Sequence, residues 1–396
     1  MTRRALGLIA ALLALAGGPA LAQRPGIVSI GYVDLEKDAR YEPVRGTEQI
    51  IIERRERPIV AAELALDESQ PISQVIQRDF QLVYFRTTQE QNLIDQVVAA
   101  VDRHGIRLFV LDLPAPTVEH LASALRGKPA LLFNATAPDD ELRREVCAAN
   151  LVHVIPSRAM ATDALAQYIV AHKWRDVLLL EGPLEADAVQ ADAFARSAKK
   201  FGARLVDRRR FKLGNDPRER EANDVGLLTA TDHDYDVVFV ADSDGEFARN
   251  LPYRTTRPRP VIGSAGLAAV AWHWTWERYG APQLINRFLR RANRPMTGPD
   301  WSVWMAVKMV VQAGLRTNGG EPPALIRYIL GDAGFDGAKG LAVSVRPWDH
   351  QVRQAMLLAT HDAVIASAPL PGFLHATNEL DTLGDDAPET PCRLGG

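Results

Sequence analysis

Acidic and amide side chains follow several short apolar runs of this sequence. Asp34 follows residues 27–33, and Asp112 follows residues 106–111. If these runs are parallel strands, the side chains gather where ligands bind in open α/β sheets, beyond the carboxyl ends of the strands. Each could equally be a helix N-cap or a solvated loop charge. The whole set comprises Asp34, Asp112, Asn134, Glu181 and Asp242, with Ser243, Asp244 and Glu246 directly behind it.

Four of these carboxylates together could bind a hard cation. Such cations prefer many carboxylate and carbonyl oxygens in a flexible geometry. The sequence has no D-x-D-x-D-G loop, so the site would have to be assembled from separate loops. A cleft lined by these acids would prefer a cation or a polyol over an anion. The candidate metal ligands are Asp112, Glu181, Asp242 and Asp244.

Apolar runs rich in Val, Leu and Ile alternate with amphipathic segments through most of the chain. This alternation predicts parallel sheets covered by helices on both faces. The runs form two βα-repeating regions, residues 27–155 and 156–263, and helices are then predicted at residues 265–279, 282–291 and 299–315. The arginine-rich residues 36–57 are predicted to form a long loop. A further helix is predicted within residues 216–229.

Length and charge limit the possible functions. The chain has 396 residues, 47% hydrophobic and 24% charged, which is enough for two α/β domains with full cores. Its formal net charge is −3, and no cluster of Lys and Arg with interleaved aromatic residues is present, so we do not expect it to bind nucleic acid.

The N-terminus has the features of a secretory signal. Two arginines precede an apolar run at residues 5–16, which is too short to span a bilayer, and residues 20–22 form an A-x-A cleavage site. We expect cleavage after Ala22. The residue directly after this site is Gln23 rather than a cysteine, so no lipid anchor is indicated. No later apolar run reaches transmembrane length, so the expected product is a soluble exported protein without membrane insertion.

The two cysteines are Cys147 and Cys392. In an oxidising compartment an even pair suggests a disulfide, which here would attach the C-terminal tail to the body of the protein. Two unrelated thiols are the alternative, because geometry cannot be checked from the sequence.

Residues 335–354 contain the most specific motif. They begin Phe-Asp-Gly-Ala-Lys-Gly and, after an apolar run, continue Arg-Pro-Trp-Asp-His-Gln-Val-Arg-Gln from Arg346. This order resembles the closing segment of periplasmic substrate-binding proteins of branched-chain amino acid type ABC importers. With Trp directly before Asp-His-Gln, the segment is most similar to that of the subfamily associated with PQQ-dependent alcohol oxidation. The stretch Phe-Lys-Leu-Gly-Asn-Asp at residues 211–216 is a second point of resemblance.

The resemblance implies a type I periplasmic binding fold, with two doubly wound parallel-sheet lobes joined by a hinge of three crossings. Lobe 1 would hold residues 26–155 and 264–334, and lobe 2 would hold residues 156–263 and 335–368. Residues 369–396, rich in Pro, Gly and acidic residues, are expected to be a flexible tail. The Asp-His-Gln segment would lie near the hinge, as a structural hydrogen-bonding corner.

The same resemblance implies a periplasmic protein that closes on a small ligand and presents it to an ABC permease and its ATPase. A link to PQQ-dependent alcohol oxidation suggests an alcohol-derived solute. Two alternatives stay open: delivery of calcium or a lanthanide to a PQQ-dependent dehydrogenase, and a periplasmic sensor that does not transport. No cofactor is implied beyond such a bound metal.

We do not expect an enzyme. Ser264, His273 and His350 are present, but the G-x-S-x-G, H-E-x-x-H and G-x-x-x-x-G-K-[ST] motifs are absent. Asp349 and His350 could form a dyad, although the resemblance favours the structural corner.

The ligand-binding candidates combine strand-end positions with the resemblance. Amino acid binding members of the family that this chain resembles hold the ligand carboxylate with small hydroxyl residues after the third and fourth strands. In the corresponding loops of this chain, only Thr136 has a hydroxyl. Tryptophans such as Trp272 and Trp301 could form a wall for an organic ligand or simply belong to the core. Arg158 is a further candidate by position. The predicted ligand-binding residues are Asp34, Tyr41, Asp112, Asn134, Thr136, Ser157, Glu181, Asp242 and Ser264.

Overall fold

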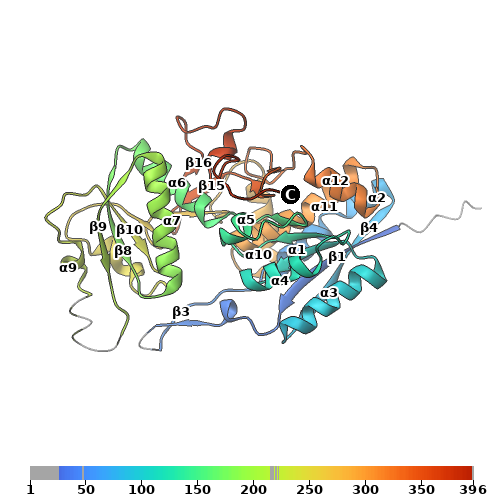
Figure 1. The fold of residues 1–396 in the computed structure, drawn as a ribbon, viewed down its shortest axis with the longest axis horizontal. Helices are drawn as coiled ribbons and strands as arrows, with labels where there is room; N and C mark the ends of the chain where they lie inside the picture. Colours follow the sequence, from blue (N-terminus) through green and yellow to red (C-terminus); the bar gives the residue numbers. More distant parts are fainter. Residues whose placement is uncertain (1–25, 47–48, 215–217, 219–220, 222, 395–396) are drawn as a thin grey trace, which may run out of the picture.

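The computed structural model describes residues 26–46, 49–214, 218, 221 and 223–394. Within them the chain forms two α/β lobes that lie next to each other along the longest axis of the molecule (Figure 1). The predicted fold class is therefore confirmed. The predicted signal segment, residues 1–22, lies outside the described residues, as do Asn215 and Asp216 of the second motif.

Lobe 1 is built on a five-stranded sheet in which every pairing is parallel. Three neighbouring strands, from the centre of the sheet to one edge, are apolar and buried, as expected for a sheet covered on both faces. In order across the sheet, the strands are β4 (Arg78–Thr87), β1 (Gly26–Leu35), β5 (Leu108–Asp112), β6 (Leu131–Asn134) and β7 (Leu151–His153).

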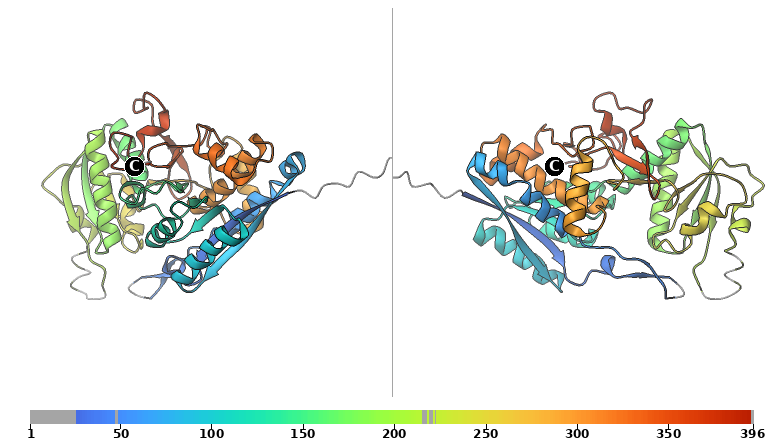
Figure 2. Two further views of the ribbon diagram at one scale, coloured as in Figure 1. Left: turned by 45° about the vertical axis from the view of Figure 1, so that its right-hand side comes forward. Right: turned by 180° about the vertical axis from the view of Figure 1, so that it is seen from behind.

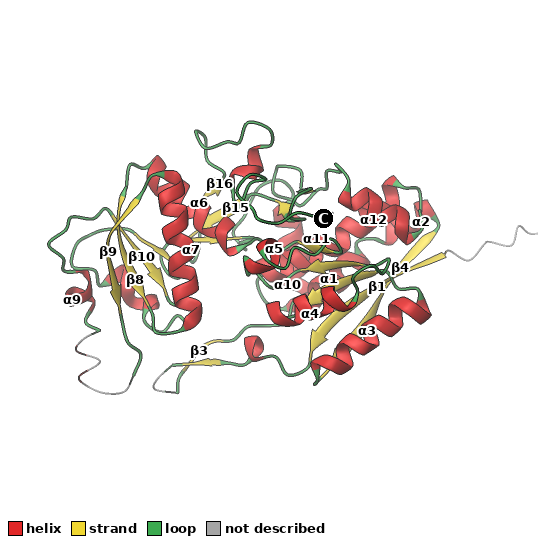
Figure 3. Ribbon diagram, in the orientation of Figure 1, coloured by secondary structure: helices red, strands yellow, loops and turns green. Residues whose placement is uncertain are grey.

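Helices cover both faces of this sheet, as Figure 3 shows by colour. α3 (Glu90–His104) buries Leu93 and Val97 against one face and ends at Gly105, whose φ of 68° suits glycine. α11 (Gly298–Arg316) buries Trp301 in the core of the other face. The remaining helices are α1 (Ile59–Asp67), α2 (Gln70–Ile76), α4 (Ala115–Ala124), α5 (Glu141–Arg144), α10 (Ala281–Ala292) and α12 (Pro322–Leu330).

Lobe 2 has a four-stranded parallel sheet with the order β11-β10-β8-β9. The strands are β8 (Asp176–Glu181), β9 (Arg204–Arg210), β10 (Val237–Ala241) and β11 (Val261–Gly263). α6 (Arg158–Ala171) and α7 (Glu185–Phe201) pack on one face, while α9 (Val225–Thr229) and the 3₁₀ helix η2 (Ala248–Tyr253) pack on the other. No helix among the described residues is long and apolar enough to cross a membrane.

An antiparallel sheet formed late in the chain adjoins lobe 2. It consists of β12 (Ala268–Val270), β15 (Met356–Ala359) and β16 (Val364–Ala368). The helix predicted at residues 265–279 was therefore wrong in this region. Gly266 has a φ of 71°, which is incompatible with a helix, and pairing with β15 satisfies the backbone instead. Of the helix predicted within residues 216–229, the structure describes α9 as its last part.

The chain crosses between the lobes three times, but two crossings lie away from the predicted boundaries. The first follows β7, at residues 154–157, close to the expected position. The second lies near Val270 and Ala271, because β12 still pairs with β15 of lobe 2. The third lies at residues 353–356, because Val352 of the short hairpin formed by β13 (Ser344–Val345) and β14 (Val352–Arg353) is still buried in the lobe 1 core.

The closing motif forms a buried polar corner at the first crossing. Gln351 donates its side-chain amide to the carbonyls of His153, at 2.9 Å, and Ile155, at 3.2 Å, and accepts from Arg143 at 2.8 Å. Gln354 donates to the carbonyl of Val154 at 2.7 Å. The structural corner expected near the hinge is present. Asp349 accepts from the backbone N–H of Gln351.

Residues 369–394 are packed against both lobes rather than forming the flexible tail that we expected. Asp381, which is 2% exposed, accepts hydrogen bonds from Arg346 and Arg353 of the closing motif at 2.9 and 2.7 Å. Its carboxylate therefore compensates two buried guanidinium groups. The ion pair of Asp381 and the burial of Leu383 offset the conformational entropy lost when the tail becomes ordered. The amino-acid composition of the tail does not reveal these contacts.

A disulfide between Cys147 and Cys392 joins the end of the tail to lobe 1, with the two Cα atoms 5.3 Å apart. It closes a loop spanning 245 positions of the sequence.

Replacing both cysteines with serine should lower the free energy of unfolding by roughly 2–4 kcal/mol, because the disulfide restricts the unfolded chain. Urea unfolding of the wild-type and the double variant, with and without reductant, measures this difference. Reductant should destabilise the wild-type protein and leave the variant unchanged; equal stability of all four samples would contradict a disulfide in solution.

Candidate functional site

A cavity of about 360 Å³ lies between the lobes, where the three crossings meet. Its walls come from lobe 1, from lobe 2 and from the crossings themselves, so a molecule inside it touches both lobes. The lining residues are largely apolar, and none of them is Asp or Glu. Those that matter for binding are Thr136, Ile155, Ser157, Arg158, Ala161, Leu165, Gln190 and Met356.

The N-terminus of α6 forms one edge of the cavity. Ser157 caps the helix by accepting a hydrogen bond from the backbone N–H of Met160 at 3.1 Å. Arg158 is the first helical residue, and its Nη2 donates to Asp139 at 3.3 Å. Its Nη1 is buried and has no hydrogen-bond partner among the described residues. Arg158 is the one charged residue of the cavity lining.

On lobe 1, the acids at the carboxyl edge of the sheet are paired with arginines. Asp34 accepts from Arg57 at 2.9 Å and from Arg86 at 2.8 Å. Asp112 accepts from Tyr41 and, at 3.2 Å, from Arg40. Each carboxylate therefore already has a cationic partner, and the acidic cleft expected from the strand ends is electrically compensated on this side.

Arg40 links this network to the cavity. Its Nη1 donates to Thr136, a cavity residue, at 3.0 Å, and its Nη2 also pairs with Asp38. Burial raises the pKa of the Asp112 carboxyl, and the positive charge of Arg40 opposes that shift. Burial and the neighbouring Asp112 also raise the pKa of Tyr41, which stays protonated and can donate.

The loop predicted at residues 36–57 forms an arm that reaches lobe 2. It contains the 3₁₀ helix η1 (Ala39–Tyr41) and a hairpin of β2 (Val44–Arg45) and β3 (Ile51–Glu53). In both views of Figure 2 this arm runs from lobe 1 towards lobe 2 on the side away from the packed C-terminal segment. Arg55 donates to the carbonyl of Ser243 at 3.4 Å.

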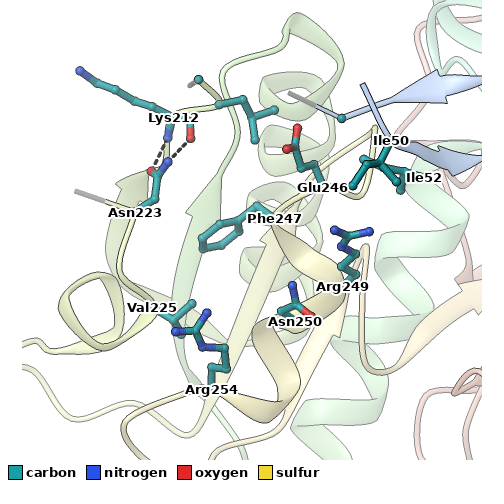
Figure 4. A pocket seen from close by; sticks show the side chains of 13 residues that line it. Ile50, Ile52, Lys212, Asn223, Val225, Glu246, Phe247, Arg249, Asn250 and Arg254 are labelled. Atoms are coloured by element: carbon teal, nitrogen blue, oxygen red, sulfur yellow. Dashed lines mark hydrogen bonds between the residues drawn. The ribbon is translucent and has the colours of Figure 1, made fainter. Parts of the chain in front are cut away.

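The arm and lobe 2 enclose a second cavity, of about 400 Å³. Figure 4 shows Ile50 and Ile52 of the arm beside Glu246, with Phe247 and Arg249 of lobe 2 below Glu246 in this view. The arm therefore touches lobe 2 at a place separate from the three crossings.

On lobe 2, Glu181 ends β8 and Asp242 follows the neighbouring strand β10, but the two carboxylates have different partners. Glu181 pairs with Arg208 and Arg210. Asp242 accepts from the backbone N–H of Ala248 at 2.7 Å through Oδ2, while its Oδ1 is buried without a partner among the described residues. Ser264 accepts from the backbone N–H of Asp242 and donates to Gln190, which reaches the cavity.

The structure thus brings together only part of the predicted site. Thr136 and Ser157 line the interlobe cavity, and Ser264 contacts the lining residue Gln190. Tyr41 contacts Asp112, which is not part of the lining. Asn134 instead has a structural role, since it donates to the carbonyl of Ala137 at 2.8 Å and contacts His153.

The four predicted metal ligands are dispersed. Asp112 belongs to lobe 1 and the other three to lobe 2, where Glu181 is held by arginines and Asp242 lies beside Asp244. Among the residues that the structure describes, no group of three or more His, Cys, Asp or Glu side chains could hold a metal ion.

Four tryptophans belong to the core of lobe 1 rather than to the cavity wall: Trp272, Trp276, Trp301 and Trp304. Trp301 donates to the carbonyl of Gly337 and Trp276 to that of Ala338. Trp304 donates to Glu68. None of the tryptophans lines the interlobe cavity.

The sequence did not indicate a role for Gln190, Arg40 or Arg57. For the two arginines, the arginine-rich stretch at residues 36–57 was the available signal.

Comparison with known proteins identifies the fold. No protein-family profile and no curated protein matches the chain. Solved structures do match. One is a periplasmic ligand-binding protein of a branched chain amino acid ABC transporter from Burkholderia xenovorans, with 13% identity and a TM-score of 0.68, covering 92% of this chain and 99% of the other.

Two further matches carry a ligand. A solute-binding protein of an ABC transporter from R. palustris, in complex with benzoate, has 12% identity, a TM-score of 0.61 and coverage of 93% and 99%. An ABC transporter substrate-binding protein from Desulfitobacterium hafniense, in complex with Leu, has 15% identity, a TM-score of 0.62 and coverage of 86% and 98%.

Asp242 makes a pH dependence testable. Burial raises the pKa of its carboxyl from 3.8 to about 7, and Asp244 adds to the shift. The folded protein then holds this proton more tightly than the unfolded chain, so the free energy of unfolding should fall as the pH rises through this range. Asp242→Asn should flatten that fall in urea unfolding measured at successive pH values. The exposed Asp232→Asn should keep the wild-type profile; identical profiles for all three proteins would be the contrary result.

These matches and the two parallel sheets show that the chain has the type I periplasmic binding protein fold, the fold that the sequence predicted.

Proposed function

We propose that this chain is the solute-binding component of an ABC importer and binds a small organic solute between its lobes, without catalysing a reaction. The observation that carries the proposal is the interlobe cavity, because residues of both lobes and of all three crossings line it. Its volume of about 360 Å³ suits a small molecule, since ligand pockets generally measure about 300–1,000 Å³.

Binding would act by population shift. A solute that touches Thr136 of lobe 1 and Gln190 of lobe 2 makes more contacts when the lobes are closed, so it favours the closed state by that difference in affinity. The three crossings supply the hinge, and a membrane permease with its ATPase would accept the closed form.

The structural matches support this class of ligand. Two proteins of the same fold were solved with benzoate and with Leu, both of which are small carboxylic acids with an apolar part. The fold and the mostly apolar lining of this cavity fit a solute of similar size.

The proposed setting is the periplasm, after removal of residues 1–22. The resemblance of the Trp-Asp-His-Gln segment further suggests a solute produced by PQQ-dependent alcohol oxidation.

Uptake of a labelled solute by cells with and without this gene tests transport. Loss of a cellular response with unchanged uptake would instead indicate a sensor.

Filling the cavity should abolish binding. Ala161 is half-buried at the cavity wall, and Ala161→Trp would occupy space that the solute needs. We expect benzoate at a hundredfold excess over its dissociation constant to stabilise the wild-type protein by about 2.7 kcal/mol and to leave the stability of the variant unchanged. Small-angle X-ray scattering should show a smaller radius of gyration only for the wild-type protein with solute.

The matched control is Ala124→Trp, on the exposed face of α4 in lobe 1. It adds the same side chain away from the cavity and should respond as the wild-type protein does. Equal responses of the Ala161 variant and this control would place binding elsewhere.

A further inference from the structure

We propose that the solute is a carboxylic acid without an amino group, and that its carboxylate pairs with Arg158. This inference rests on the proposed function, because it concerns the ligand of the same interlobe cavity. Four features of the cavity lead to it: its charge, the state of the Arg158 guanidinium, the occupancy of the neighbouring helix N-terminus and the apolar walls.

The charge of the cavity lining has one sign. Arg158 contributes the only charged side chain, and no carboxylate lines the cavity. The two acids that contact the N-terminus of α6 already have partners, because Asp139 accepts from Arg158 and Asp140 accepts from the backbone N–H of Ala159 at 2.9 Å. A solute carboxylate would therefore meet a cation, whereas a solute ammonium group would meet no carboxylate.

The guanidinium of Arg158 is only partly used. Its Nη2 contacts Asp139 at 3.3 Å, while its Nη1 is buried with no hydrogen-bond partner among the described residues. A buried N–H donor without an acceptor is unfavourable, and a carboxylate is the acceptor that matches an arginine best. Because Nη1 has no exposed surface in this structure, a solute carboxylate would reach it only after a shift of the Arg158 side chain; it would then satisfy Nη1 and displace no existing hydrogen bond of that atom.

The N-terminus of α6 cannot take the place of Arg158. The backbone N–H of Arg158 donates to the carbonyl of Pro138 at 2.9 Å, and the N–H groups of Ala159 and Met160 are held by Asp140 and Ser157. With these backbone donors occupied, the side chain of Arg158 is the charged group at this edge that is able to bind an anion.

The rest of the lining selects the body of the acid. Ile155, Leu165 and Met356 present hydrocarbon surface, which suits an aromatic or aliphatic ring or chain. Gln190 accepts from Ser264 through its carbonyl oxygen, and its amide group can donate to a second polar group of the solute. An amphiphilic acid with the carboxylate at one end fits both features.

The test compares acids with neutral molecules of the same shape. Benzoate and cyclohexanecarboxylate should bind the wild-type protein in isothermal titration calorimetry, and benzamide and benzyl alcohol should bind at least tenfold more weakly. Phenylalanine, which adds an ammonium group, should also bind more weakly than 3-phenylpropionate. Arg158→Gln should reduce binding of the acids at least tenfold and leave the neutral molecules unchanged.

Two controls separate binding from folding and from general charge. Asp139→Asn leaves the guanidinium in place without its partner, so acid binding should be kept or strengthened. Arg103→Gln removes an exposed arginine at the end of α3 and should behave as the wild-type protein does. Thermal unfolding of each variant verifies that it is folded.

Each outcome decides between the two proposals. If benzoate and benzamide bind equally well, or if Arg158→Gln keeps full acid binding, the carboxylate assignment is wrong while solute binding in the cavity stands. If no acid and no neutral molecule binds the wild-type protein, the carboxylate assignment is wrong and the proposed function loses its support as well.

Discussion

The arrangement of the two lobes depends on a hydrogen-bonded corner of buried polar side chains at the first crossing. Gln351 binds the carbonyls of His153 and Ile155 and is itself held by Arg143. Because a buried amide or guanidinium without partners is costly, this corner fixes the third crossing against the first. The cavity lies beside it, so the same bonds that hold the hinge also set the distance between the walls of the binding site.

Pairing with arginines changes the electrostatic character of the cleft. A count of strand-end residues suggests an acidic site, yet Asp34 and Asp112 are compensated by arginines of the arm and of β4. Charges that neutralise one another within a lobe attract no ion from outside. The one charged side chain of the cavity lining is instead that of Arg158, which pairs with Asp139 through Nη2 and leaves Nη1 without a partner among the described residues.

The sequence predicted the parts of the structure that depend on local pattern. The alternation of apolar runs and amphipathic helices is sufficient to predict both sheets. The hinge was located by the resemblance of the Asp-His-Gln segment to a known family, not by local pattern. Long-range partners decided the rest. The tail is ordered because Asp381 meets two arginines from a distant motif, and residues 268–270 form a strand because β15 is available to pair with them. No local pattern indicates these contacts, which also explains why Gln190 was missed.

The disulfide gives the chain a closed covalent path. It joins Cys147, just before the first crossing, to Cys392, near the end of the chain, so all of lobe 2 and all three crossings lie within one ring. A single break in any exposed loop of lobe 2 would open this ring without releasing a fragment. The two lobes would then remain one molecule until the disulfide was also reduced.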